Sequence, residues 1–259
     1  MSAQLLSTSQ GRTMVLTLSN PGHRNALGPE MYAAGVEALS VAETHSDVRS
    51  VLITGEGALF CAGGDLHRLQ ANRQLDPAVQ AESIEGLHNW IEAIRTFPKP
   101  VIAAVEGAAA GAGFSLALAC DFIVAASDAV FVMAYSNVAL SPDGGASWGL
   151  AQALPRQLVS ELLMGGERMS APRLHALGLV NRVCDPGQAM NAALALAENL
   201  NARAPNVLAS IKELLNEAPQ ASLTQQLAQE RKHFVRNLHH PNAGSGIASF
   251  LAKQKPSYE

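Results

Sequence analysis

The chain has 259 residues, 48 % of them hydrophobic and 15 % charged, which is enough for one sizeable core or for a core with a helical appendage. Its 18 Lys and Arg and 22 Asp and Glu residues give a net charge of −4 with no polybasic run, so neither a nucleic acid nor an anionic membrane is expected as a partner. Three widely spaced cysteines, at positions 61, 120 and 184, argue against a disulfide framework or zinc knuckle, and with an N-terminus unlike a signal peptide they predict a reducing, cytoplasmic setting.

The first part of the chain alternates strand-like and helix-like segments. The run MVLTL at residues 14–18 predicts a strand. Pro29 and Glu30 then open a helix, because proline and an acidic side chain both suit the first turn. Residues 51–54 (VLIT) are almost entirely apolar, which is typical of a strand buried on both faces of a parallel sheet. A glycine-rich loop follows at residues 55–65.

A long helix is predicted beyond that loop, ending near Pro98. Its apolar residues recur at three- and four-residue steps, at Ile84, Leu87, Ile91 and Ile94. Residues 70–83, before it, are expected to form a loop that closes over a binding pocket. Further strands are predicted at residues 101–105, 122–125 and 130–133. Strand–helix–strand units with connections of this length indicate parallel crossovers and an α/β core.

The last quarter of the chain has an almost purely helical pattern, from about residue 186 to residue 255. Apolar helices at a chain end predict packing or assembly contacts. We therefore expect an α/β core in residues 1–199 and a helical C-terminal region in residues 200–259.

Two glycine-rich turns each follow a predicted strand, FCAGGD at residues 60–65 and EGAAAGAGFS at residues 106–115. Small residues let the backbone approach a ligand, and two N–H groups converging on one point would make an oxyanion hole. Close helix–strand packing requires the same residue types, so both interpretations stay open. Neither turn carries a phosphate-binding motif. The uncharged stretch 107–120 is too short to cross a bilayer.

With these turns, the chain resembles the enoyl-CoA hydratase/isomerase, or crotonase, superfamily over nearly its whole length. The matching segments are residues 25–27, 60–65, 99–107, 110–113, 120–121, 142–145, 177–180 and 246–253. The resemblance implies an α/β crotonase (ClpP/crotonase-like) fold of repeated ββα units with a helical C-terminal trimerisation region. It also implies a homotrimer or hexamer, an acyl-CoA substrate, and no cofactor other than the coenzyme A of that substrate.

By the same resemblance, the backbone N–H groups of Gly64 and Ala112 form the oxyanion hole for the thioester oxygen. The family usually has glycine at position 112, and alanine keeps the N–H group. The residues expected on the substrate-binding side are Ala26, Ala62, Asp65, Leu66 and Ser115. Phe250 and Lys253 match residues that reach coenzyme A, often from a neighbouring subunit, although both also suit an ordinary amphipathic helix.

The acid–base residue is the open question. Hydratases of the family use two glutamates, and the matching positions here hold Ser115 and Tyr135, neither of which is an adequate base near neutral pH. Enoyl-CoA isomerases and the ring isomerase of phenylacetate degradation resemble this chain around Asp143, which there takes a proton from one carbon and returns it to another. From the residues alone, an N-cap on a helix near Gly145 is the favoured role of Asp143, and the two roles do not exclude each other.

A second branch of the superfamily, the hydrolytic dehalogenases of aromatic acyl-CoA, has a nucleophilic aspartate at the position of Asp143. It also has an aromatic residue matching Tyr135 and a histidine matching His88. Without the resemblance, His88 is interpreted as a partly buried histidine bonded to the backbone. The adjacent His239 and His240 point to different sides of a helix, so no metal site is predicted.

The preferred hypothesis is an enoyl-CoA isomerase in which Asp143 moves the proton and Tyr135 and Ser115 shape or hydrogen-bond the acyl pocket. One alternative is a hydratase that activates water through Asp143 alone. Another is a hydrolase or ring-opening enzyme acting on an aromatic-derived acyl-CoA. The third is a catalytically silent acyl-CoA binder, suggested by the two missing glutamates.

Overall fold

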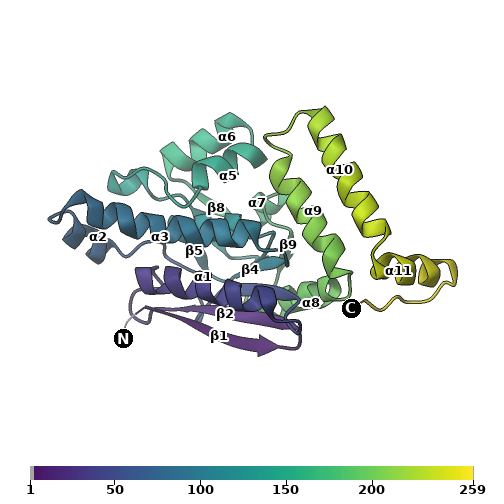
Figure 1. Cartoon of the computed structure of the whole chain (residues 1–259). Coiled ribbons are helices and arrows are strands. Elements are labelled where there is room, and N and C mark those ends of the chain that lie inside the picture. The colour runs from purple at the N-terminus through teal and green to yellow at the C-terminus, as the bar shows by residue number, and fades with distance from the viewer. Residues whose placement is uncertain (1–2, 259) are drawn as a thin grey trace.

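The computed structural model describes residues 3–258 and has the expected α/β architecture, a central sheet with helices on both faces (Figure 1). The main sheet has the strand order β1-β2-β3-β4-β6-β9. Its strands are β1 (Gln4–Gln10), β2 (Thr13–Ser19), β3 (Ser50–Gly55), β4 (Val101–Val105), β6 (Phe122–Ala126) and β9 (Arg182–Cys184). Within this sheet, β1 and β2 pair antiparallel, and the other pairs of described strands are parallel. The parallel core predicted from residues 51–54 is therefore confirmed.

A second, three-stranded sheet has the order β5-β7-β8 and carries the loops around the site. It consists of β5 (Ala108–Ala110), β7 (Val130–Val132) and β8 (Arg168–Ser170). β5 and β7 run parallel, whereas β7 and β8 run antiparallel. This sheet begins at the second glycine-rich turn and therefore places that turn beside the segment after β7.

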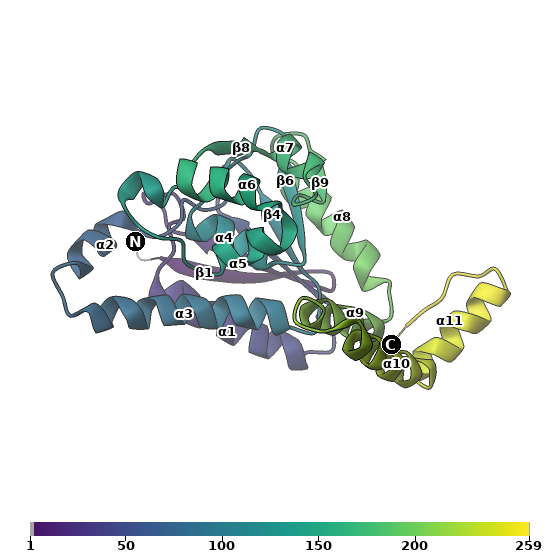
Figure 2. The ribbon, with the colours of Figure 1, turned by 90° about the horizontal axis from the view of Figure 1, so that it is seen from above.

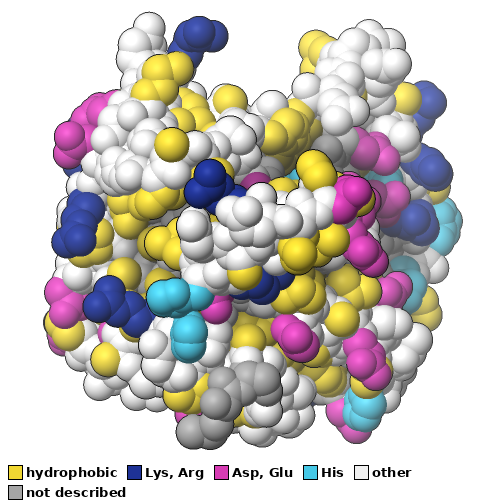
Figure 3. All heavy atoms as spheres, turned by 90° about the vertical axis from the view of Figure 1, so that its left-hand side faces the viewer, with side chains coloured by type: hydrophobic (Ala, Val, Ile, Leu, Met, Phe, Trp, Pro, Cys, Tyr) yellow, Lys and Arg dark blue, Asp and Glu magenta, His cyan; other side chains and the backbone are white. Residues whose placement is uncertain are grey.

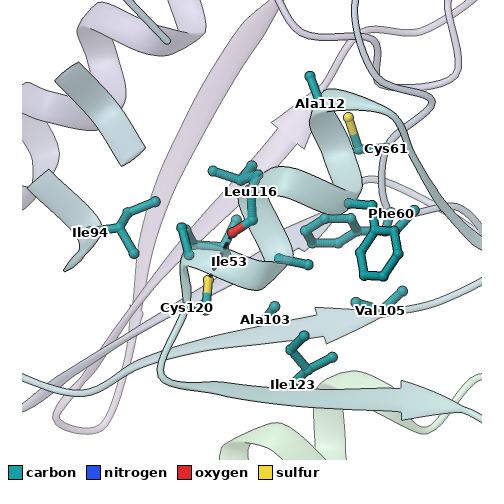
Figure 4. Close-up of a cluster of buried hydrophobic side chains, with 14 of the residues drawn as sticks. Ile53, Phe60, Cys61, Ile94, Ala103, Val105, Ala112, Leu116, Cys120 and Ile123 are labelled. Atoms are coloured by element: carbon teal, nitrogen blue, oxygen red, sulfur yellow. Dashed lines mark hydrogen bonds between the residues drawn. The ribbon is translucent and has the colours of Figure 1, made fainter. Parts of the chain in front are cut away.

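From β2 to β6 the main sheet is buried on both faces, and successive side chains of a strand point to opposite faces. In β2, Leu16 and Leu18 belong to the large core cluster, whereas Val15 belongs to a smaller cluster on the opposite face. α1 (Pro29–Thr44), α3 (Pro77–Thr96) and α4 (Ala112–Ala119) contribute to the large cluster, part of which is drawn in Figure 4. α8 (Ala189–Asn201) covers the other face.

The prediction of a loop at residues 70–83 is wrong. α2 (Leu66–Asn72) and α3 (Pro77–Thr96) occupy most of it and leave only residues 73–76 as a connection. Asp76 accepts a hydrogen bond from the Ala78 N–H at 2.8 Å, and Pro77 stands in the first turn. This N-cap chemistry starts α3 earlier than the apolar periodicity alone indicates.

The segment between β7 and β9 contains β8 and several short helical pieces. These are η1 (Ser136–Val138), α5 (Ala146–Ala153), α6 (Arg156–Ser160), the π-helical η2 (Glu161–Gly165) and α7 (Ala171–Ala176).

On the face seen in Figure 3, acidic and basic side chains are interspersed. Within residues 3–258, no helix combines the length and hydropathy that crossing a membrane requires.

The C-terminal region is helical, as the sequence predicts. It comprises α9 (Pro205–Glu217), α10 (Leu223–Leu238) and α11 (Pro241–Leu251). α9 packs against α3, whereas α11 stands away from the α/β core in both ribbon views (Figures 1 and 2). Large apolar side chains are exposed on these helices, among them Leu215, Leu223, Phe234, Phe250 and Leu251.

Candidate active site

The two glycine-rich turns are joined by backbone hydrogen bonds. The Cys61 N–H donates to the Ala108 carbonyl at 3.0 Å, and the Ala110 N–H donates to the Cys61 carbonyl at 2.9 Å. At Gly113 an added Cβ would lie 2.7 Å from the Cys61 Cβ, so only glycine lets the turns approach this closely. Figure 4 shows Ala112 and Cys61 side by side at one end of the buried cluster.

Gly64 and Ala112 each present a backbone N–H without an acceptor. α4 begins at Ala112, so this N–H is one of the first four that have no acceptor within a helix. Among residues 3–258, neither of the two N–H groups donates a hydrogen bond. Both residues line one cavity of about 360 Å³. Two unpaired donors on residues that line one cavity are the kind of arrangement that stabilises an oxyanion.

Asp143 lines the same cavity and is half-buried. The Tyr135 hydroxyl donates to Asp143 Oδ1 at 2.5 Å. The Ser115 hydroxyl donates to the main-chain carbonyl of Asp143 at 3.0 Å and lies 3.4 Å from the Tyr135 oxygen. α5 begins after Gly145 without a side-chain cap, so the N-cap interpretation of Asp143 is wrong.

Tyr135 is a hydrogen-bond donor in this arrangement and not a base. Burial raises the pKa of its phenol first, and the negative charge of Asp143 raises the pKa further. Tyr135 is only 8 % exposed. The phenol therefore keeps its proton at neutral pH and directs it to the carboxylate.

His88 reaches the same cavity from α3 but is not bonded within it. Its side chain is 42 % exposed, and its Nδ1 lies 3.9 Å from Glu85 Oε2, one helical turn earlier. The predicted bond from His88 to the backbone is not present among the hydrogen bonds of residues 3–258. The structure thus brings His88 to the wall of the cavity without linking it to Asp143 or Tyr135.

A second cavity, of about 590 Å³, adjoins the first and shares Ala62, Gly64 and Leu66 with it. Of the five residues expected on the substrate-binding side, Ala26, Ala62, Asp65 and Leu66 line it. Ser115 is buried and lines neither cavity. Asp65 also caps α2, because its Oδ1 accepts the His67 N–H at 2.9 Å.

The second cavity is also lined by His67, which the resemblance puts near the acyl-CoA entrance, and by three residues that the sequence did not single out: His23, Arg24 and Arg168. His23 Nδ1 lies 3.4 Å from Asp65 Oδ2. Arg24 directly precedes the motif at residues 25–27, which was the available signal for its place. Arg168 lies in β8, far away in sequence, and no local pattern marks it.

Phe250 and Lys253 do not reach either cavity within one chain. Phe250 lies on α11 with 82 % of its surface exposed, and Lys253 follows that helix. In the described residues, no group of three or more His, Cys, Asp or Glu side chains is placed to hold a metal ion.

The chain matches known proteins over nearly its whole length, in sequence and in fold. A family model described as "Enoyl-CoA hydratase/isomerase" matches residues 8–259. A 1,2-epoxyphenylacetyl-CoA isomerase of Escherichia coli K12 is 36 % identical, with 98 % of this chain and 97 % of that protein covered. A 2,3-dehydroadipyl-CoA hydratase of the same organism is 31 % identical, with 99 % of each covered. The crystal structure of an enoyl-CoA hydratase from Polaromonas sp. JS666 superposes with a TM-score of 0.98 at 71 % identity, covering 98 % of this chain and 99 % of that one.

Proposed function

Because the chain belongs to the enoyl-CoA hydratase/isomerase family and is therefore an acyl-CoA enzyme, we propose that it shifts the double bond of an enoyl-CoA thioester, with Asp143 as both base and acid. One observation carries the proposal. Asp143 lines the cavity that also holds the unpaired N–H groups of Gly64 and Ala112. The two positions that match the hydratase glutamates hold hydroxyl side chains, so a single carboxylate is left for proton transfer.

One carboxylate is enough for both proton transfers of the proposed reaction. Asp143 takes the proton from C2 of a 3-enoyl-CoA, and the electron pair of the C–H bond delocalises onto the thioester oxygen. The N–H groups of Gly64 and Ala112 donate to that oxygen while its negative charge develops. The same carboxyl group then returns the proton to C4, and the remaining double bond lies between C2 and C3.

The proposal is tested by the ultraviolet absorbance of the conjugated 2-enoyl thioester formed from a 3-enoyl-CoA. Asp143→Asn is expected to lower kcat by roughly 10²- to 10⁴-fold, the usual contribution of a general acid–base group. The affinity for an inert saturated acyl-CoA stays within about twofold, because the amide keeps the shape of the carboxylate. Asp128→Asn, at an exposed carboxylate outside both cavities, is the control. Full turnover by Asp143→Asn would refute the proposal.

Hydration is the second candidate, supported by the relatives that are named hydratases. In that case Asp143 alone activates water, and the absorbance of a 2-enoyl-CoA disappears on addition of enzyme. Hydrolysis at the ring carbon of a halogenated aromatic acyl-CoA, in which Asp143 would attack and His88 would take part, displaces halide and leaves the thioester intact, so released halide is the signal to measure. A silent acyl-CoA binder gives none of these signals yet is stabilised against heat by coenzyme A esters.

We also propose that the chain assembles as a homotrimer or hexamer through residues 200–259. Exposed apolar side chains on α9, α10 and α11 support this, because extended apolar patches usually mark contacts between subunits. Phe250 and Lys253 would then reach the coenzyme A of a neighbouring subunit, and no cofactor beyond that coenzyme A is proposed. Sedimentation equilibrium measures the assembly, and a monomer at micromolar concentration would contradict it.

A further inference from the structure

Two buried hydroxyl groups donate hydrogen bonds to Asp143, one to its main chain and one to its side chain. The Ser115 hydroxyl, on a residue that is 1 % exposed, donates to the main-chain carbonyl of Asp143 at 3.0 Å. The Tyr135 hydroxyl donates to the side-chain oxygen Oδ1 at 2.5 Å. The other side-chain oxygen, Oδ2, accepts no hydrogen bond from the described residues 3–258. The main chain and one carboxylate oxygen are thus fixed, and one oxygen is left free.

The same two residues are anchored to the turn that supplies Ala112. The Ser115 N–H donates to the Gly111 carbonyl at 3.0 Å, one turn into α4. A Cβ added at Gly111 would lie 3.7 Å from Cζ of Tyr135, so the ring packs directly over this turn. Asp143 is therefore held against the segment that carries one of the two unpaired N–H groups.

We propose that Ser115 and Tyr135, here named the hydroxyl pair, are positioning residues that fix Asp143 opposite the unpaired N–H groups and leave Oδ2 as the atom that moves the proton. This inference rests on the proposed function. The substrate proton passes from carbon to Oδ2 and back to carbon, while the phenol proton stays on Tyr135. Neither hydroxyl gains or loses a proton during the cycle, so the hydroxyl pair acts through Asp143 and not on the substrate.

Geometry is what the hydroxyl pair contributes. Proton transfer requires donor and acceptor atoms at hydrogen-bond distance, and a displacement of about 1 Å costs on the order of 10²-fold in rate. The side chain of Asp143 has two rotatable bonds, and without the phenol it has no hydrogen-bond partner among residues 3–258. Loss of the phenol is therefore expected to lower the fraction of time in which Oδ2 faces the substrate.

The test compares Tyr135→Phe and Ser115→Ala with the matched control Tyr32→Phe. Tyr32 is another buried tyrosine, 4 % exposed, but it donates no hydrogen bond to Asp143 among the described contacts. We expect Tyr135→Phe to lower kcat roughly 10- to 100-fold and Ser115→Ala to lower it several-fold. The dissociation constant of an inert saturated acyl-CoA stays within about twofold in both variants. Tyr32→Phe keeps both quantities.

The outcomes separate this inference from the proposed function. Turnover that is lost in Asp143→Asn but unchanged in both hydroxyl variants would overturn the positioning role and leave the proposed function standing. Turnover that survives Asp143→Asn would overturn both. A loss of acyl-CoA affinity as large as the loss of kcat would show that Tyr135 contacts the substrate, against the inference. Ser115→Ala removes only one oxygen atom, so it provides the test if Tyr135→Phe does not fold.

Discussion

Gly144 lies so close to Ser115 that a Cβ added to Gly144 would come within 2.9 Å of the Ser115 Cβ. Its φ is +58°, in the left-handed region that favours glycine. The close approach lets the Ser115 hydroxyl reach the carbonyl of the preceding residue, Asp143, at 3.0 Å. The glycine after the aspartate thus serves the geometry of the site.

Gly144→Ala is expected to lower the free energy of unfolding by roughly 2–4 kcal/mol, from backbone strain and overpacking together, and to lower kcat by displacing Asp143. Gly178→Ala is the control, since Gly178 has φ +85° but no atom within 4 Å of an added Cβ. Gly178→Ala is expected to lower the free energy of unfolding through backbone strain alone, by on the order of 1 kcal/mol. Urea unfolding measures both, and equal losses would mean that the contact with Ser115 has no energetic weight.

Gly113→Ala is expected to separate the two glycine-rich turns. The new Cβ would meet the Cys61 Cβ at 2.7 Å and its Sγ at 2.8 Å, and overpacking of this kind costs about 1–3 kcal/mol. Activity falls as well, because Gly64 moves away from Ala112. In the Gly113→Ala/Cys61→Gly double variant, part of the activity returns, since contacting residues couple. Gly149→Ala is the neutral control, because the nearest atom to its new Cβ would be the Leu118 Cβ at 3.9 Å.

Asp121→Asn is expected to destabilise the junction between the core and α9. Lys212 Nζ lies 2.7 Å from Asp121 Oδ2 and also donates to the Ile94 carbonyl at 2.9 Å. Removing one charge of a buried pair costs roughly 3–5 kcal/mol, because the other is left unpaired. Asp121→Asn/Lys212→Met is expected to cost less. Glu213→Gln, at an exposed pair with Arg236, costs about 0–1 kcal/mol. Equal effects in chemical denaturation would contradict the prediction.

The stability of the protein is expected to fall above pH 10 through Tyr32. Burial, the largest cause, raises the pKa of Tyr32 from 10.0 to about 12. The folded state then holds a proton that the unfolded state loses, so this stabilisation is complete below pH 10 and disappears as the pH rises to about 12. Between pH 9 and pH 11, wild type should lose roughly 1–1.5 kcal/mol more than Tyr32→Phe. Parallel losses in the two proteins would contradict this assignment.

Regular periodicity predicted most of the core, and its failures have local causes. The strand at residues 14–18, the parallel strand at residues 51–54 and the long helix ending before Pro98 are all confirmed. β1 was missed because it is a largely exposed edge strand of polar composition, QLLSTSQ. α2 was missed because none of its residues is buried, so it has no apolar face to give a helical period.

The sequence by itself determined the family and the two glycine-rich turns. Glycine, which lacks a side chain, and the period of a helix or a strand can both be recognised within a short segment. It left Asp143 between a helix cap and a catalytic group, because both roles suit an aspartate before two glycines. Only the tertiary structure decided that the capping role is wrong. Tyr135 and Ser115 lie 8 and 28 residues before Asp143, and their hydroxyl groups converge on it only when β7 and α4 pack together.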